Sequence, residues 1–421
     1  MKQETYGQQN DDIIQQRLKG PQGTKVKVTI FRPGLREERD YEIERALITV
    51  PSVNDDVLPG QIGYVEIIQF AQDTAQQLDE TLARLEQQGI KGLILDVRNN
   101  TGGYLETAVD VVGHFVGPGQ LVVYTEGRSE TEKKWVTRRV TRHGDYPIVM
   151  LVNGRSASAS EILAGAMQFY GKAKLVGERT FGKGSVQNPL QLQTRLPEPF
   201  VDTNKDGRWD PGEPFTDRNK NGKWDPGSLI KLTTARYFLP NHQSIHTERD
   251  ENGRVIQGME GGIKPDITVK WEGIKPWKEE ELADLIEKDV FKSYVDKHFA
   301  GNEQLFMKLA ENDDYDPSRY PEFDAWYDSL GTHLSKEDIR QWVRTFSRDK
   351  VSDLRKKVFP GVRFLGDFEQ DNQLQAGLVT LCGMMNVDPA SIAEYHAFAN
   401  RKFGEVAQDG EAKDSKESKA K

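Results

Sequence analysis

The sequence predicts an α/β protein, and three observations support this class. Two segments, GLILDVRNN and PIVMLVN, are almost continuously apolar, as strands buried on both faces of a sheet are. Residues 74–88 carry Leu78, Leu82 and Leu85 at helical spacing, which predicts an amphipathic helix before the first of these strands. Strand patterns at IGYVEIIQF and KAKLVGE, with a helix expected over residues 106–115, continue the alternation. Alternating strands and helices indicate an α/β layer with crossover connections.

Two regions of different character flank this core. Before it, residues 11–19 predict a short amphipathic helix, and GTKVKVTIFRPG and DYEIERALI predict two strands. After Lys275 the pattern becomes helical, with helices expected over residues 279–299, 336–359 and 388–403. The final segment, GEVAQDGEAKDSKESKAK, has almost no apolar residues, so we expect it to be disordered.

Composition excludes several classes of protein. The 421 residues include 57 Lys and Arg against 66 Asp and Glu, a net charge of −9, which argues against unspecific nucleic-acid binding. No apolar run reaches the roughly 18 residues of a membrane span. Cys382 is the only cysteine, so neither an intrachain disulfide nor a Cys-rich zinc site is possible. The first residues, MKQETYGQQNDD, lack the apolar core of a signal peptide.

The segment VNGRSASASEILAG carries the richest chemistry. A buried strand runs into a turn of small residues, and a helix begins there. A serine at a helix N-terminus lies beside free N–H groups that favour developing negative charge, as acyl transfer requires. The alternative is that Ser156, Ser158 and Ser160 are only N-capping residues.

Two further segments add to this pattern. VGERTFGKGSVQ offers Lys183 between two glycines that allow close backbone approach, and a partly desolvated lysine can act as a general base. The alternative is a lysine in a solvated or phosphate-binding loop. The phosphate-binding pattern GxxxxGK[ST] is not complete here. NNTGGYL offers glycine N–H groups at a strand end; an ordinary tight turn is the alternative.

The segments LDVRNNTGGYL, VNGRSASASEILAGAM and VGERTFGKGSVQ, in this order, resemble the carboxyl-terminal processing protease family, also called tail-specific proteases. The resemblance extends from about Lys19 to Val269 and implies a ClpP/crotonase-like protease core. It implies Ser158 as nucleophile and Lys183 as base. It also implies that Gln187, one helical turn beyond the lysine, holds the lysine in place. The implied oxyanion hole combines the N–H of Ala159 with that of Gly102 or Gly103.

The resemblance implies a serine endopeptidase that cleaves protein or peptide substrates near their C-termini through an acyl-enzyme. No cofactor would take part in the chemistry, and the family is periplasmic, cell-envelope or secreted. A catalytically inactive peptide-binding scaffold of the same fold is the alternative. A Ser/His/Asp hydrolase is a weaker rival, because no GxSxG elbow is present. Oligomeric state and physiological substrate do not follow from the sequence.

The family carries a PDZ domain before its protease core. Residues 11–45 resemble only the last helix and strands of such a domain, so we expect a truncated start. The expected division is a partial PDZ domain at 1–48, a protease core at 49–275 with an insertion at 200–228, a helical region at 276–404 and a tail at 405–421.

The insertion contains two copies of one motif, DTNKDGRWDPGE and DRNKNGKWDPGS, fifteen residues apart. The first copy fits the calcium loop D-x-[DN]-x-[DN]-G-x₅-E. Its ligand positions hold Asp202, Asn204, Asp206, the carbonyl of Arg208, Asp210 and Glu213. The second copy holds Asp217, Asn219, Asn221 and Asp225, but Ser228 stands at the twelfth position, so we expect weaker binding there. Calcium would be structural; a metal-free acidic hairpin is the alternative.

Overall fold

The computed structural model describes residues 18–32, 37–46, 51–127, 132–138, 143–192, 196–203, 207, 209–210, 212–361 and 364–406. It divides into two compact units at Pro51. In the first unit, β1 (Lys25–Arg32) and β2 (Glu37–Glu44) form an antiparallel hairpin. These are the two strands expected there, while the helix expected over residues 11–19 lies almost entirely outside the described residues.

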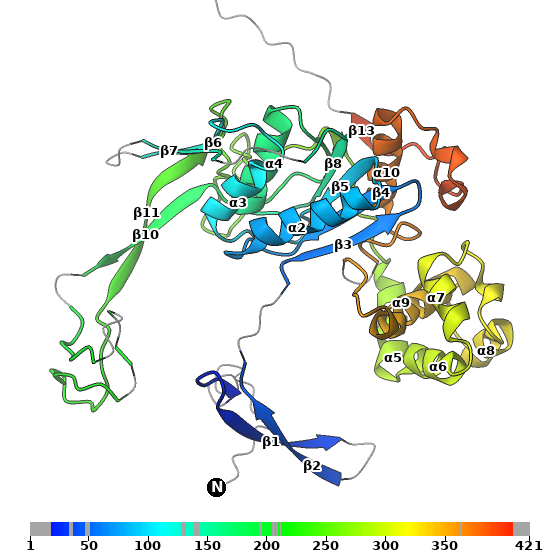
Figure 1. Cartoon of the computed structure of the whole chain (residues 1–421), viewed down its shortest axis with the longest axis horizontal. Coiled ribbons are helices and arrows are strands. Elements are labelled where there is room, and N and C mark those ends of the chain that lie inside the picture. The colour runs from blue at the N-terminus through cyan, green and yellow to red at the C-terminus, as the bar shows by residue number, and fades with distance from the viewer. Residues whose placement is uncertain are drawn as a thin grey trace, which may run out of the picture. The chain divides into compact units, whose positions relative to one another are not determined.

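The second unit is built on a seven-stranded sheet (Figure 1). Its order is β13-β12-β9-β8-β5-β4-β3, with β12, β9, β8, β5 and β4 parallel and the two edge strands antiparallel to their neighbours. The α/β prediction is confirmed at this level. The strands are β3 (Val53–Leu58), β4 (Ile62–Ile67), β5 (Gly92–Asp96), β8 (Ile148–Val152), β9 (Lys174–Gly177), β12 (Ile267–Thr268) and β13 (Glu405–Val406).

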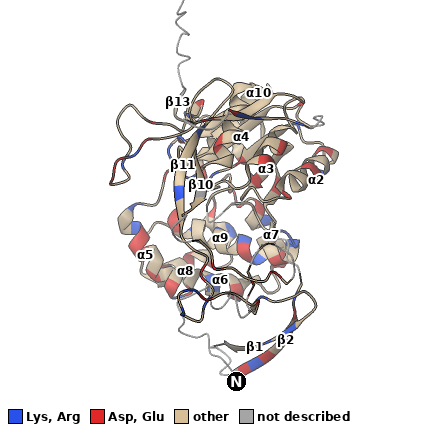
Figure 2. Ribbon diagram, turned by 90° about the vertical axis from the view of Figure 1, so that its left-hand side faces the viewer, with Lys and Arg blue, Asp and Glu red and all other residues tan. Residues whose placement is uncertain are grey.

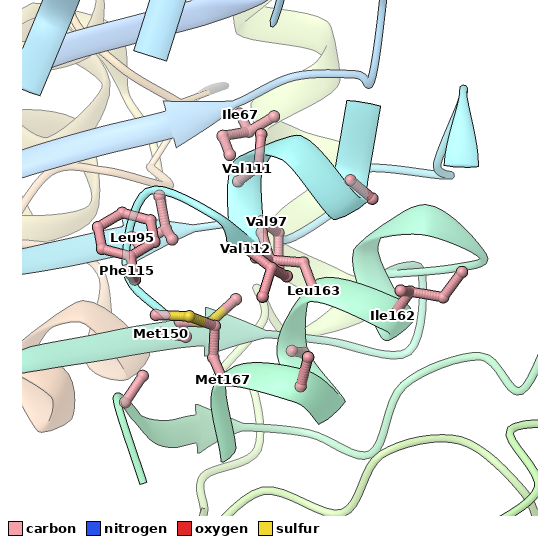
Figure 3. Close-up of a cluster of buried hydrophobic side chains, with 14 of the residues drawn as sticks. Ile67, Leu95, Val97, Val111, Val112, Phe115, Met150, Ile162, Leu163 and Met167 are labelled. Carbon is pink, nitrogen blue, oxygen red and sulfur yellow. The ribbon is translucent and has the colours of Figure 1, made fainter. Parts of the chain in front are cut away.

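Both faces of the two central strands are buried, which explains their continuous apolar sequence. Leu93 and Leu95 of β5 lie in the same core as α2 (Thr74–Gln87), α3 (Leu105–Val112) and α4 (Ala159–Phe169). Figure 3 shows Leu95 with Val111 and Val112 of α3 and Ile162, Leu163 and Met167 of α4. Ile94, between them, lies in the core that α10 (Asn372–Met384) covers. Because strand side chains alternate between faces, one apolar run supplies two cores. The ends of β5 and β8 are therefore held firmly in place.

A second sheet of four antiparallel strands has the order β10-β11-β6-β7. The insertion at residues 200–228 joins β10 to β11, which are consecutive in the sequence. The strands are β6 (Leu121–Glu126), β7 (Lys133–Val136), β10 (Ser185–Gln191) and β11 (Leu229–Phe238).

The C-terminal helices have an aromatic-rich core of their own, which includes Phe291 and Phe306. They are α5 (Pro276–Glu287), α6 (Val290–Phe299), α7 (Glu303–Glu311), α8 (Phe323–Leu330) and α9 (Lys336–Arg355). The helix expected over residues 279–299 is interrupted at Asp289, which takes a left-handed conformation. No helix in the described part of the chain is long and apolar enough to span a membrane.

Two expectations about the C-terminus are wrong. Residues 388–403 do not form one helix, because Ile392 is extended (φ −98°, ψ 113°) and separates two short 3₁₀ turns. Glu405 and Val406, assigned to the disordered tail, form β13 and pair with β12. Residues 407–421 lie outside the described residues.

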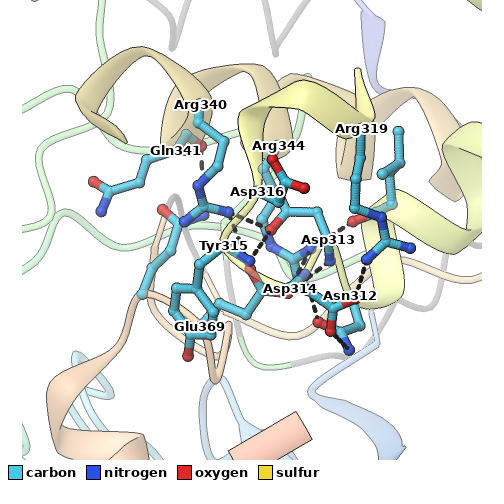
Figure 4. Close-up of polar contacts among 12 residues, drawn as sticks. Asn312, Asp313, Asp314, Tyr315, Asp316, Arg319, Arg340, Gln341, Arg344 and Glu369 are labelled. Atoms are coloured by element: carbon cyan, nitrogen blue, oxygen red, sulfur yellow. Dashed lines mark hydrogen bonds and ion pairs between the residues drawn. The ribbon is translucent and has the colours of Figure 1, made fainter. Parts of the chain in front are cut away.

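A buried cluster of charges stabilises the helical region (Figure 4). Arg340 and Arg344 of α9 are fully buried and pair with three carboxylates, those of Asp313, Asp367 and Glu369. Charges this deep are tolerated only when each is paired, so the loss of one partner leaves the others uncompensated.

Replacing Arg344 with methionine is therefore expected to lower the free energy of unfolding by about 3–5 kcal/mol. Urea denaturation monitored by circular dichroism measures this change. The control is Lys297→Ala, which removes a pair whose two side chains are each 68% exposed and should cost less than about 1 kcal/mol. Equal effects of the two changes would contradict a stabilising role for the buried cluster.

Candidate active site

Ser158 occupies a strained turn between β8 and α4. Its backbone has φ 57° and ψ −113°, while the helix begins at the next residue. A non-glycine residue in such a conformation costs about 1–3 kcal/mol and persists only where the surroundings impose it. Strain of this kind concentrates at active sites, and here it falls on a serine at a helix N-terminus.

The neighbouring serines have other roles. Ser156 and Ser160 are fully buried. Their hydroxyls donate hydrogen bonds to the carbonyls of Val97 (2.8 Å) and Asn100 (2.9 Å), which follow β5. Ser158 alone among the three is partly exposed. The structure thus distinguishes Ser158 from residues of the same type two positions away, which spacing in the sequence could not do.

The carboxylate of Glu161 joins the Ser158 turn to the Lys183 segment. One oxygen accepts the hydroxyl of Thr180 and the N–H of Gly182, each at 2.6 Å. The other accepts the N–H groups of Ser158 and Lys183, each at 2.8 Å. Burial raises the pKa of this carboxyl, and the four hydrogen bonds act in the opposite direction.

Sequence reasoning missed Glu161. A signal was present, because Ser158 followed three residues later by glutamate fits a capping box, in which the glutamate reaches back to the N-cap N–H. The local pattern gives no sign that Glu161 also accepts hydrogen bonds from residues 180–183, which lie far along the chain.

The side chains of Lys183 and Gln187 are both exposed. Among the described residues, no hydrogen bond joins the Nζ of Lys183 to the Oγ of Ser158. The structure therefore brings the two backbones together through Glu161, but not the two functional atoms. Gln187 does not lie one helical turn beyond the lysine, because the segment is strand β10; it pairs with Thr233 of β11 next to a register shift.

The glycines on either side of Lys183 are tightly packed. A Cβ on Gly182 would lie 1.7 Å from the hydroxyl oxygen of Thr247, and one on Gly184 would lie 2.3 Å from the backbone nitrogen of His246. Only glycine allows such contacts, so the main chain that carries Lys183 is fixed even though the lysine side chain is exposed.

Gly102 lies directly against the serine turn. A Cβ on Gly102 would lie 2.8 Å from the Cβ of Ser158 and 3.0 Å from the nitrogen of Ala159. The N–H of Gly102 donates to the side chain of Asn100 at 2.8 Å. Within the described part of the chain, the N–H groups of Ala159 and Gly103 have no acceptor, so of the two glycines Gly103 is the one with an available donor.

Buried charges fix the end of β5 that leads to these glycines. Arg98 bonds to Asp96 and to Asp371, which caps α10. The hydroxyl of Tyr64 donates to Asp96 at 2.5 Å. This network connects the glycine turn to the helix on the opposite face of the sheet.

Residues 61–269 match the family model described as Peptidase family S41. These residues belong to peptidase family S41. The match contains the serine turn, the glycine turn and the Lys183 segment.

The carboxyl-terminal-processing protease of Synechocystis sp. is 41% identical over 180 residues, which are 42% of this chain and 42% of that protein. The carboxy-terminal-processing protease of Bartonella bacilliformis is 34% identical over 272 residues, which are 63% of this chain and 51% of that protein. The chain thus spans about half the length of the curated relatives it matches. Among solved structures, a photosystem II D1 C-terminal processing protease matches at 25% identity and a TM-score of 0.39, covering 60% of this chain and 57% of that one.

The insertion lies inside the segment of family S41. Asn204, Asp206 and Arg208, three of the expected calcium ligands, are outside the described residues. Glu213 accepts the N–H groups of Thr203 (2.7 Å) and Asp210 (3.0 Å), which are residues of the first loop. The twelfth-position glutamate therefore closes its loop.

The second loop is closed differently from our expectation. Ser228 stands at its twelfth position, but the buried carboxylate of Glu198 accepts the N–H groups of Arg218 (2.5 Å) and Asp225 (3.1 Å). Arg218 and Asp225 correspond to Thr203 and Asp210 of the first loop. Glu198 and Glu213 begin two tandem fifteen-residue units, EPFVDTNKDGRWDPG and EPFTDRNKNGKWDPG. Each unit thus provides the glutamate that closes the loop of the other.

The indoles of the two units repeat this symmetry. Trp209 donates to the carbonyl of Glu213 and Trp224 to that of Glu198, at 3.1 and 2.8 Å. The two rings stack with centroids 5.2 Å apart. The two loops form one symmetric module rather than two independent hairpins.

Glu161→Gln tests the link between the two site segments. The glutamine side chain places an NH₂ group where one oxygen of Glu161 now accepts two hydrogen bonds. Two buried donors then lose their acceptor, and each loss should cost about 1–3 kcal/mol of stability. The amides of Ser158, Gly182 and Lys183 should lose protection from hydrogen exchange, measured by mass spectrometry. Glu106→Gln, an exposed glutamate in the first turn of α3, is the control. Unchanged protection in Glu161→Gln would contradict the link.

Proposed function

We propose that the chain is a serine endopeptidase of the C-terminal processing type, which cleaves protein substrates near their C-termini. The observation that carries the proposal is the strained, partly exposed Ser158, joined through Glu161 to the backbone of Lys183. Membership of residues 61–269 in peptidase family S41 and the names of the relatives support it.

In this mechanism Lys183 removes the proton from the Ser158 hydroxyl as Oγ attacks the scissile carbonyl. The N–H groups of Ala159 and Gly103 stabilise the oxyanion, since that of Gly102 already donates to Asn100. The protonated lysine then gives its proton to the leaving amine, and the same lysine activates the water that hydrolyses the acyl-enzyme. Gln187 would hold the lysine, and no cofactor takes part.

The exposed Lys183 defines one requirement of this proposal. A lysine that acts as a general base must be desolvated and within hydrogen-bond reach of its proton donor. Catalytic hydrogen bonds often tighten only when substrate is bound. We infer that substrate binding orders the Lys183 side chain against Ser158, over a main chain that is already fixed by Gly182 and Gly184.

Several finer assignments rest on the family resemblance. The strand–helix repeats of the second unit support a ClpP/crotonase-like core over residues 49–275. The hairpin β1–β2 is compatible with the end of a PDZ domain in residues 1–48. We place the protein in the periplasm, cell envelope or secreted fraction by the same resemblance. The rival function is an inactive scaffold that binds peptides without cleaving them.

Calcium is proposed as a structural ion of the insertion. Asp202 Oδ1 is buried and has no hydrogen-bond partner among the described residues, as expected for an atom that ligates a cation. The first loop would use Asp202, Asn204, Asp206, the Arg208 carbonyl, Asp210 and Glu213. The second would use Asp217, Asn219, Asn221, Asp225 and, in place of the missing twelfth residue, Glu198.

Ser158→Ala should lower cleavage of an unfolded protein substrate by roughly 10⁴-fold or more. Lys183→Arg should be as inactive as Lys183→Ala, because an arginine remains protonated. Ser156→Ala and Ser160→Ala, which keep the nucleophile, are the controls and should retain much more activity. Substrate binding without turnover in the wild type would favour the scaffold. An active Lys183→Arg variant would point to a histidine base, with His242 and His246 the first to test.

Calorimetry should show calcium binding that raises the melting temperature. Glu198→Gln should weaken one site and Glu213→Gln the other, because each removes a loop-closing carboxylate. Ser228→Ala, which changes the residue at the twelfth position of the second motif, should leave both sites intact. No binding at millimolar calcium would refute the proposal and leave a metal-free hairpin, without affecting the assignment of Ser158.

A further inference from the structure

A second cluster of ionisable side chains lies where α2 and α3 pack together, and the proposed peptidase mechanism does not use it. Asp79 projects from α2, His114 follows α3, and His143 precedes β8. The Oδ1 atom of Asp79 lies 3.4 Å from His114 Nδ1 and 3.0 Å from His143 Nε2. All three atoms lie within 4.8 Å of one another. Both imidazoles are buried, while the Asp79 side chain is 47% exposed.

The second nitrogen of each ring has a partner on the side away from Asp79. His114 Nε2 lies 3.0 Å from the carbonyl oxygen of Ala75, which can only accept, so this nitrogen carries a hydrogen. His143 Nδ1 lies 3.0 Å from both oxygens of Glu86, and His143 Nε2 lies 3.0 Å from Asp79 Oδ1, so this ring lies between two carboxylates. When Glu86 accepts the hydrogen of His143, the neutral rings present their lone pairs at His114 Nδ1 and His143 Nε2, the two atoms that face Asp79.

Two lone pairs facing a carboxylate oxygen require a positive charge between them. A proton on each ring supplies this charge, and so does one metal ion shared by the three atoms. The outer contacts favour the metal ion, because metal-binding histidines donate their other N–H to a carbonyl or a carboxylate. Glu86 is itself oriented, because the hydroxyl of Tyr146 donates to it at 3.1 Å. The cluster therefore combines three central atoms that can coordinate a metal ion with outer hydrogen bonds that orient both imidazoles.

We propose that Asp79, His114 and His143 bind a zinc ion. Tetrahedral zinc with ligands at about 2.0–2.1 Å separates its donor atoms by about 3.3 Å, close to the two distances above. Two imidazoles and one carboxylate suit zinc, whereas calcium prefers oxygen ligands only. The exposed side of Asp79 leaves a fourth position for water.

The ion would stabilise the fold rather than take part in peptide cleavage. It joins α2 to the turn after α3 and to the segment that leads into β8, the strand that ends before Ser158. Binding to the folded state alone raises stability in proportion to the logarithm of zinc concentration above the dissociation constant.

The test uses the full chain, freed of metal with a chelator, with excess calcium added to occupy the insertion. Calorimetry should show one zinc ion per chain, zinc should raise the melting temperature, and cobalt should give the visible absorption of a four-coordinate site. His143→Ala and Asp79→Asn should abolish all three signals. Glu86→Gln should weaken zinc binding about 10–100-fold, because it removes an outer partner. His333→Ala, at a side chain 90% exposed, is the control.

Asp79 is half-exposed, so Asp79→Asn should fold, and circular dichroism checks this. Wild-type affinity for zinc in folded Asp79→Asn would overturn the proposal. The absence of zinc binding by the wild type would also overturn it and identify the cluster as a hydrogen-bonded ion-pair network.

Discussion

The candidate site depends on one buried carboxylate. Glu161 is fully buried and accepts four hydrogen bonds, from Ser158 at the start of its own helix and from Thr180, Gly182 and Lys183 on a separate segment. A buried acid is costly unless its oxygens are satisfied, so the two segments must approach together for the fold to hold it. The strained turn at Ser158 and the fixed backbone at Lys183 both follow from this requirement.

The sheet provides the rigid frame for that interaction. β5 and β8 are packed on both faces, and the turns that follow them carry Gly102 and Ser158. The network of Arg98 extends this frame to α10 on the far face. The exposed side chain of Lys183 therefore extends from a main chain that Gly182 and Gly184 hold in place. Rotation of this side chain is then the motion needed to assemble the proposed dyad.

The sequence predicted those features that depend on local pattern. Continuous apolar runs identified β5 and β8, and helical spacing identified α2 almost to the residue. It could not choose among three serines at equal spacing, because their burial and backbone strain depend on contacts with Val97 and Asn100. It also could not find Glu198, since the second of the two proposed calcium loops is closed by a glutamate outside the motif that defines the loop. The helix expected over residues 388–403 is not formed, because Ile392 takes an extended conformation and packs against the core that α10 covers.

The most direct test of the account is covalent labelling with a fluorophosphonate, followed by mass spectrometry of the labelled peptide. Wild-type protein should carry one adduct, on Ser158, while heat-denatured protein and Ser158→Ala should carry none. Glu161→Gln should label much more slowly, because the turn and the lysine segment are no longer held together. An adduct on Ser156 or Ser160, or no adduct in the folded wild type, would contradict the account.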